Sequence, residues 1–189
     1  MKKTFCAAMF MVIFFGGMQL AAQENSGPAA VMLNHYAARN FIAGAIPTAD
    51  LNTIIEAGVR APSASNRQPW RFTVVENQTL AQKIVSNNVD GNVLIVISAS
   101  GDGKTNTREI IDCSLATQNI YLAAQAMGYG SRIYTGPIND LNNRLKGELG
   151  LPTGHNAIAV VRVGRVQPSV DAVSAASNRK RTEDVVTYK

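Results

Sequence analysis

Residues 60–72 constrain the fold of this chain more than any other stretch, because they predict a stiff, polar loop. The segment reads Arg-Ala-Pro-Ser-Ala-Ser-Asn-Arg-Gln-Pro-Trp-Arg-Phe, with Pro62 and Pro69 on either side of its polar centre and the chain's only tryptophan at Trp70. Proline fixes φ and removes a backbone donor, so we expect a loop between two regular elements. The serine and amide side chains between the prolines can bind a flat ligand with polar edges. A simple helix-to-strand connection rich in turn formers is the alternative interpretation.

The N-terminus has the pattern of a secretory signal peptide. Two lysines precede an apolar run over residues 5–20, and small residues follow it up to Ala22. This order is typical of a signal that is cleaved after export. A retained membrane anchor is the alternative, but the run is short for a span and contains two glycines. We therefore expect residues 1–22 to be a signal peptide and residues 23–189 a single domain. The mature protein would be exported, either periplasmic or secreted, without a stable membrane anchor.

Composition and charge narrow the class of protein. The chain has 189 residues, of which 46% are hydrophobic, enough for one domain with its own core. Cleavage near Ala22 removes two lysines and no acid, which lowers the formal net charge from +5 to +3. This mild positive charge suits a small anionic ligand better than a nucleic acid. Only Cys113 remains after cleavage, so no intrachain disulfide can form.

Hydrophobic periodicity predicts alternating helices and strands. We expect helices over 28–38, 48–59, 78–86, 106–127 and 138–148, and strands over 71–76, 93–97 and 156–164. The helix over 106–127 is apolar nearly all round, which indicates burial in a core or between subunits. Its start, Asn106 followed by Glu109, is typical of a capping box. Thr48 is the expected N-cap of the helix over 48–59, and 138–148 is expected to be a surface helix.

The sequence argues against two other kinds of site, a phosphate-binding P-loop and a metal site. Gly103-Lys104-Thr105 imitates the end of a phosphate-binding P-loop, but Ser98 stands where that motif needs its first glycine. His35, His155 and Cys113 are isolated from one another along the chain and form no recognisable metal-ligand pattern.

The loop over 60–72 resembles the flavin-binding loop of the nitroreductase family, in which Ala-Pro-Ser-x-x-Asn-x-Gln-Pro-Trp-x-Phe is characteristic. Three further segments, 35–41, 112–136 and 179–186, match the family in the same order. The resemblance implies an α+β, nitroreductase-like fold, with a mixed, mostly antiparallel sheet flanked by helices and a long, buried central helix. It also implies flavin mononucleotide (FMN) as the cofactor and a homodimer that binds FMN at the subunit interface.

The resemblance implies one group of residues at the FMN phosphate and ribityl chain. In the family the first segment runs Arg-Arg/His-Ser-x-Arg/Lys-x-Phe, and its first and third residues hold the phosphate. This chain has His35 where arginine is usual, Tyr36 next, Ala37 where serine is usual, and Arg39 near the ring or ribityl chain. The family's C-terminal tail supplies another arginine to the phosphate, and Arg179 matches it.

A second group would hold the flavin ring. From the loop of the partner subunit, the resemblance implies contacts by Pro62, Ser63, Ala64 and Asn66. From the segment after the long helix, it implies contacts along the face and edge of the ring by Ile133, Tyr134, Thr135 and Gly136. The backbone N–H of Thr135 is our choice for the donor to the nitrogen that exchanges hydride, because a backbone donor is fixed and does not titrate.

These implied features predict an FMN-dependent oxidoreductase. Hydride would pass in ping-pong fashion from NAD(P)H or another small-molecule donor to a nitroaromatic or quinone-like acceptor, with no catalytic side chain. Export separates the chain from cytoplasmic nicotinamide, so an exported flavin-binding protein with little or no turnover is the alternative. A flavin-free relative is the third possibility, if His35 and Ala37 abolish phosphate binding.

Overall fold

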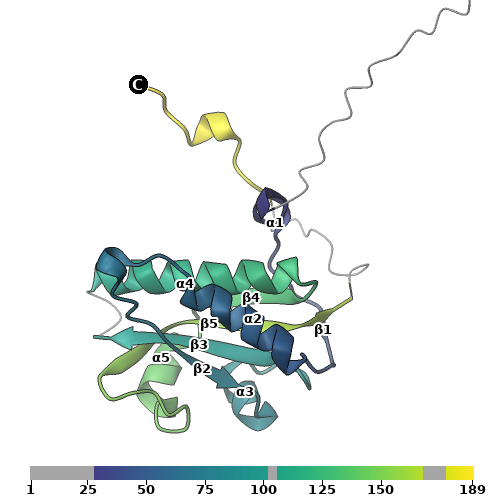
Figure 1. Ribbon diagram of the computed structural model, residues 1–189. Helices are drawn as coiled ribbons and strands as arrows, with labels where there is room; N and C mark the ends of the chain where they lie inside the picture. Colours follow the sequence, from purple (N-terminus) through teal and green to yellow (C-terminus); the bar gives the residue numbers. More distant parts are fainter. Residues whose placement is uncertain (1–27, 102–105, 168–177) are drawn as a thin grey trace, which may run out of the picture.

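One antiparallel sheet with helices on both faces organises the computed structural model, which describes residues 28–101, 106–167 and 178–189. Helices α2 (Thr48–Val59) and α4 (Thr107–Ala126) cover one face, and α3 (Gln78–Ile84) and α5 (Ile138–Asp140) lie on the other (Figure 1). The expected signal peptide lies outside the described residues.

The sheet is built around its two longest strands. In the part of the chain that the structure describes, the strands are β1 (Phe41–Ile42), β2 (Arg71–Val75), β3 (Val93–Ser100), β4 (Gly130–Tyr134) and β5 (His155–Val166). β5 pairs with β1, β3 and β4, and β2 pairs with β3; all of these pairings are antiparallel. The β-branched run at the start of β3 is buried on both faces, as its composition predicts. The predicted α+β class is confirmed.

Two helices differ from the prediction in how they begin. α2 begins at Thr48 itself, after Pro47, without a side-chain cap, so the predicted Thr48 N-cap is wrong. Asn106 precedes α4 but its side chain forms no cap bond, and the carboxylate of Glu109 bonds to Arg67 instead. The predicted capping box is therefore also wrong, because a distant guanidinium holds the carboxylate that the box requires.

The expected surface helix over 138–148 is shorter and more buried than predicted. α5 leads directly into η2 (Leu141–Leu145), a π-helical turn. Leu141 is fully buried and Leu145 nearly so, in the same apolar cluster as Leu94 and Val160 of the sheet. This segment therefore covers the second face of the sheet with its leucines, while its other side is exposed at the surface.

α4 packs closely against α2 and the sheet through one face only. A Cβ atom added at Gly58 of α2 would lie 2.6 Å from Cγ1 of Ile120, so the two helices approach at a position where only glycine fits. On the outward side of α4, Ile111 is 54% exposed and Leu115 is 39% exposed. Burial of this long helix in a single chain is thus confined to its inner face.

The thiol of Cys113, on the inner face of α4, should make the free energy of unfolding depend on pH. Burial, with a smaller contribution from the neighbouring carboxylates of Asp112 and Glu109, raises the pKa of the Cys113 thiol from its ordinary value of 9.0 to about 12. Above pH 9 the unfolded chain loses this proton while the folded chain keeps it. The free energy of unfolding should then fall by up to about 1.4 kcal/mol per pH unit between pH 9 and 12.

Urea unfolding at pH 8 and pH 10 measures this dependence. Cys113→Ala should reduce the difference between the two pH values, because the variant has no thiol to ionise. An equal pH dependence in the wild type and the variant would show that Cys113 makes no contribution.

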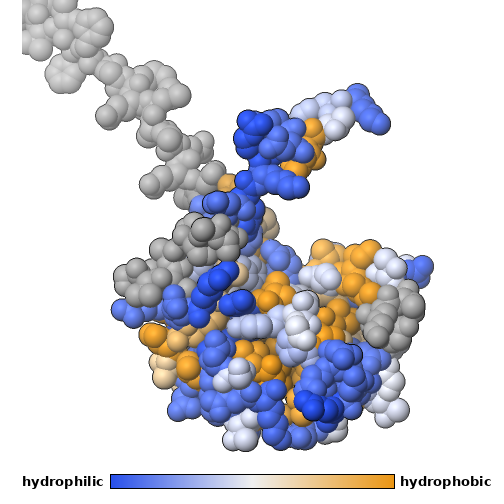
Figure 2. All heavy atoms as spheres, turned by 180° about the vertical axis from the view of Figure 1, so that it is seen from behind, coloured by the Kyte–Doolittle hydropathy of each residue, from blue (hydrophilic) through white to orange (hydrophobic). Residues whose placement is uncertain are grey.

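The N-terminal helix and the C-terminal segment project from the body of the molecule. α1 (Pro28–Asn34) and the segment with η4 (Thr182–Asp184) lie beyond α4, away from the sheet (Figure 1). Apolar side chains on these parts are exposed, and the projecting C-terminal segment is visible in the space-filling view (Figure 2). They are Met32, Leu33, Val185, Val186 and Tyr188. None of the described helices is both long enough and apolar enough to span a membrane.

Candidate functional site

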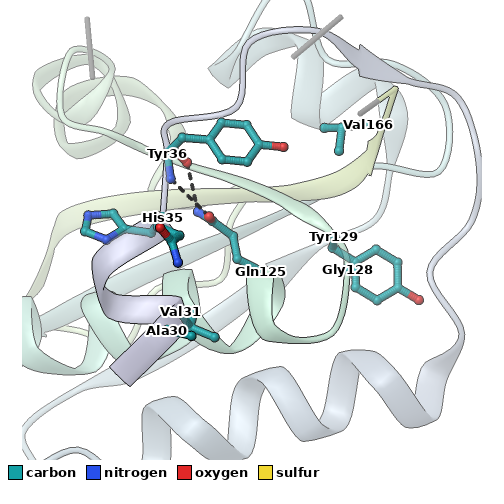
Figure 3. A pocket seen from close by; sticks show the side chains of 9 residues that line it. Ala30, Val31, His35, Tyr36, Gln125, Gly128, Tyr129 and Val166 are labelled. Atoms are coloured by element: carbon teal, nitrogen blue, oxygen red, sulfur yellow. Dashed lines mark hydrogen bonds between the residues drawn. The ribbon is translucent and has the colours of Figure 1, made fainter. Parts of the chain in front are cut away.

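The segment that follows α1 is fixed against the C-terminal end of α4. The side chain of Gln125 bonds the backbone of Tyr36 twice, accepting from its N–H at 3.1 Å and donating to its carbonyl at 2.9 Å (Figure 3). The next backbone contact is the N–H of Ala38, which donates to the carbonyl of Ser131 at 3.0 Å. These bonds place residues 35–39 beside the start of β4.

His35 and Arg179 lie near the same tyrosine. The ring of His35 meets Tyr121 of α4 edge-on, with 5.6 Å between centroids. Burial raises the pKa of the Tyr121 hydroxyl, while a hydrogen bond with Gln125 and the positive charge of Arg179 act in the opposite direction. Arg179 is thus close enough to affect Tyr121 electrostatically. Of these two residues, both predicted to hold phosphate, His35 contacts the ring of Tyr121, whereas Arg179 affects Tyr121 through its charge.

The other predicted members of this group are on the surface. Ala37 and Arg39 are exposed on either side of the buried Ala38. A cavity of about 360 Å³ lies between α1 and the end of α4 (Figure 3). It is mainly apolar, and it is lined by Ala30, Val31, Asn34, His35, Tyr36, Gln125, Gly128, Tyr129 and Val166.

The loop over 62–68 has an unusual backbone. Ser65, Asn66 and Gln68 have φ values of 53°, 52° and 48°, in the left-handed region that non-glycine residues rarely adopt. Each residue held in such a conformation destabilises the fold by about 1–3 kcal/mol. Such residues concentrate at functional sites. Within the loop, the hydroxyl of Ser63 accepts from the N–H of Gln68 at 3.0 Å. Pro62, Ala64 and Asn66 are exposed, and Ser63 is half-buried.

The third predicted segment forms the end of β4 and the turn after it. Ile133 is 37% exposed, and Tyr134 is half-buried with the guanidinium of Arg132 5.1 Å from its ring centroid. Thr135 and Gly136 are exposed at the rim of a second cavity, of about 630 Å³, between the end of the sheet and α5. The predicted hydride-site backbone at Thr135 is therefore at an accessible edge.

The three segments define an elongated site rather than a compact one. β4 follows α4 directly and runs back along it, so Thr135 lies four residues beyond Ser131, a distance of about 13 Å at the strand rise. The loop contacts α4 at Glu109, twelve residues before Tyr121, which is about 18 Å along the helix. Within one chain, the loop therefore lies far from His35 and Arg179.

This arrangement fits FMN in the chemistry of its donor set. An imidazole and a guanidinium suit a phosphate group. At the other end, the apolar and aromatic side chains of Ile133 and Tyr134 suit a ring, and the guanidinium of Arg132 lies 5.1 Å from the centroid of Tyr134. Among the described residues, no three His, Cys, Asp or Glu side chains are grouped as a metal site would require.

The comparisons with known proteins identify the family and the fold of the chain. The model of the nitroreductase family matches residues 32–90 and 89–165. A candidate NADH dehydrogenase/NAD(P)H nitroreductase of Archaeoglobus fulgidus is 33% identical over 136 residues, which are 67% of this chain and 78% of that protein. The chain belongs to the nitroreductase family.

Solved structures show the same fold. A nitroreductase with bound FMN from Desulfitobacterium hafniense has a TM-score of 0.68 and 24% identity, covering 85% of this chain and 97% of the other. A candidate nitroreductase in complex with FMN from Desulfovibrio desulfuricans has a TM-score of 0.72 and 22% identity, covering 86% and 97%. The predicted nitroreductase-like fold is confirmed.

Sequence reasoning missed Gln125, Tyr121, Asp112 and Glu109 as residues that support the site. All four lie on α4, and periodicity assigned this helix to packing. Another polar side chain of α4, that of Asn119, packs against α2 and donates to the carbonyl of Ala57 at 3.0 Å. Contacts to backbone groups 48 or 89 residues away leave no signal in a single sequence.

Proposed function

We propose that this protein is an FMN-dependent oxidoreductase that transfers hydride from NAD(P)H or another small donor to a nitroaromatic or quinone-like acceptor. The observation that carries the proposal is the contact of the His35 ring with Tyr121 at one end of β4, with the exposed Thr135 at the other end. Family membership and the FMN named with two structural relatives support it.

Different residues of this chain would bind different parts of FMN. His35, Ala37 and Arg179 would lie at the phosphate, and Arg39 would place positive charge near the ribityl chain or ring. Ile133, Tyr134, Thr135 and Gly136 would orient the ring, with the Thr135 N–H held at its reactive edge. FMN, when bound, supplies the two-electron hydride chemistry.

A second copy of the chain would complete the site. Exposed apolar side chains on α1, the outer face of α4 and the C-terminal segment are typical of a subunit interface. The loop is about 18 Å along α4 from the phosphate end, so we propose that Pro62, Ser63, Ala64 and Asn66 contact the FMN of the partner subunit.

Export is a separate proposal that rests on the N-terminal sequence alone. Mass spectrometry of the envelope fraction should find a mature N-terminus near Gln23. An intact Met1 in the cytoplasm would contradict export.

Anaerobic stopped-flow spectroscopy tests the enzyme directly. The reconstituted protein is mixed with NADH, NADPH or dithionite, and loss of the oxidised flavin band is followed; a nitroaromatic or quinone is then added. Rapid reduction by a nicotinamide and rapid reoxidation by the acceptor are expected. Reduction by dithionite alone, with slow reoxidation, would favour the exported flavin-binding protein with little turnover.

Asn66→Ala is expected to weaken FMN binding about tenfold without dissociating the dimer, because Asn66 is an exposed amide on the loop and lies off the apolar surface. Fluorescence titration measures the affinity for FMN, and sedimentation measures the dimer. Asn52→Ala, at an exposed asparagine of α2, is the matched control. Equal dissociation constants for both variants and the wild type would remove Asn66 from the site.

A further inference from the structure

We propose that Asp112 and Glu109 are positioning residues that hold the loop over 62–68 in the conformation that binds flavin. The inference rests on the proposed function for the role of the loop, but the clamp itself can be tested without flavin. Both acids lie on α4, three residues apart, and so face the loop from the same side of the helix.

Each carboxylate contacts the loop at a different point. Oδ1 of Asp112 accepts a hydrogen bond from the backbone N–H of Ala64 at 3.0 Å. Oε1 of Glu109 accepts from Nη2 of Arg67 at 3.1 Å and forms an ion pair with it. The two bonds enclose Ser65 and Asn66, two of the residues with positive φ.

Because the two acids are buried, their bonds to the loop are stronger than the bonds that Gln68 forms within the loop. Asp112 is 2% exposed and Glu109 is 7% exposed, whereas the bonds of Gln68 to Ser63 and Asn66 are exposed to water. A charge-assisted bond away from water is worth more than a neutral bond at the surface. The left-handed backbone is therefore held from α4 in addition to two backbone bonds of its own, from the N–H of Asn66 to Ser63 at 3.0 Å and from that of Arg67 to Ala64 at 3.2 Å.

A purely structural role would not select these residues. Oδ2 of Asp112 and Oε2 of Glu109 are buried without a hydrogen-bond partner among the described residues. Burying a carboxylate with unsatisfied oxygens is unfavourable, and aspartate is a poor former of helix interiors. Apolar residues would pack better at these two positions. The bonds of the two acids to the loop therefore explain their presence better than helix stability does.

The test compares Asp112→Ala with Asp112→Asn. The amide keeps an acceptor oxygen for the Ala64 N–H, whereas alanine has none. Trypsin cleavage after Arg67, mapped by mass spectrometry on the protein with and without FMN, reports on the loop. Titration with FMN reports on binding, and thermal melting reports on the whole fold.

We expect Asp112→Ala to increase the rate of cleavage after Arg67 about tenfold and to weaken FMN binding about tenfold, while Asp112→Asn stays within about threefold of wild type. Glu109→Gln, which keeps its shape but loses the ion pair, should give a smaller increase in cleavage. Asn52→Ala, at an exposed asparagine of α2, should change neither quantity.

Unchanged cleavage after Arg67 in Asp112→Ala would overturn the inference. So would a melting temperature lowered equally in Asp112→Ala and Asp112→Asn with cleavage throughout the chain, because that would indicate a general structural role. If wild-type protein bound no FMN, the proposed function would fail. The cleavage rates without FMN would still decide whether Asp112 holds the loop.

Discussion

Removal of residues 178–189 is expected to weaken FMN binding by about 100-fold or more and to convert the proposed dimer to monomer. The segment carries Arg179, whose charge affects Tyr121, and the exposed side chains of Val185, Val186 and Tyr188. Loss of a charged ligand to phosphate costs a large factor in affinity by itself, and loss of the apolar side chains removes surface that a partner subunit would cover.

Two point variants separate these effects. Arg179→Ala should reproduce about a tenfold loss of FMN affinity while leaving the dimer intact. Arg181→Ala removes the same charge from the same segment, but Arg181 already pairs with Glu183 and Asp184, so its loss should change affinity little. Equal effects of the two variants would mean that the tail acts through net charge rather than through Arg179.

Asn92→Leu is expected to destabilise the fold by about 3 kcal/mol, because it removes the main acceptor of a buried guanidinium. Arg162 of β5 is 1% exposed, and its Nε and Nη2 donate to Oδ1 of Asn92 at 3.0 and 2.8 Å. The ring of Phe41 lies 4.0 Å from the guanidinium carbon, and Nη1 donates to Asn87 at 3.2 Å. Burial lowers the pKa of Arg162, which shows how poorly its charge is solvated.

Urea unfolding gives the free energy for this prediction. Asn87→Ala, which removes one longer bond, should cost about 1 kcal/mol. The double variant Arg162→Met with Asn92→Leu should recover much of the loss, because neither partner then leaves a buried polar group unpaired. A cost for Asn92→Leu no greater than that of Asn87→Ala would show that Asn92 is not the principal acceptor.

The sequence predicted the parts of this molecule that depend on local pattern. The buried strand β3 follows from its run of β-branched residues, and the loop over 62–68 follows from its two prolines and the resemblance to the family. Local rules failed where a distant residue competed for the same group. Glu109 was assigned to a capping box, but the guanidinium of Arg67, 42 positions away, holds its carboxylate.

The support for the site could not be predicted for the same reason. Gln125 joins Tyr36 across 89 positions, and Arg162 meets Asn92 across 70. In the sequence Gln125 is one more polar residue on a long helix, and Arg162 is a charge inside a strand otherwise rich in valine. Only the folded chain shows that Gln125 fixes the backbone beside the predicted phosphate end. Likewise, only the folded chain shows that Arg162 is buried.

The absorption spectrum of the purified mature protein, recorded before and after FMN is added and excess is removed by desalting, tests the central claim most directly. The account predicts a retained flavin band near one FMN per chain, and loss of that band in Arg179→Ala at low protein concentration. A folded protein that stays colourless after reconstitution would contradict the account. It would mean that His35 and Ala37, in place of arginine and serine, do not support phosphate binding, and that this chain is a flavin-free member of its family.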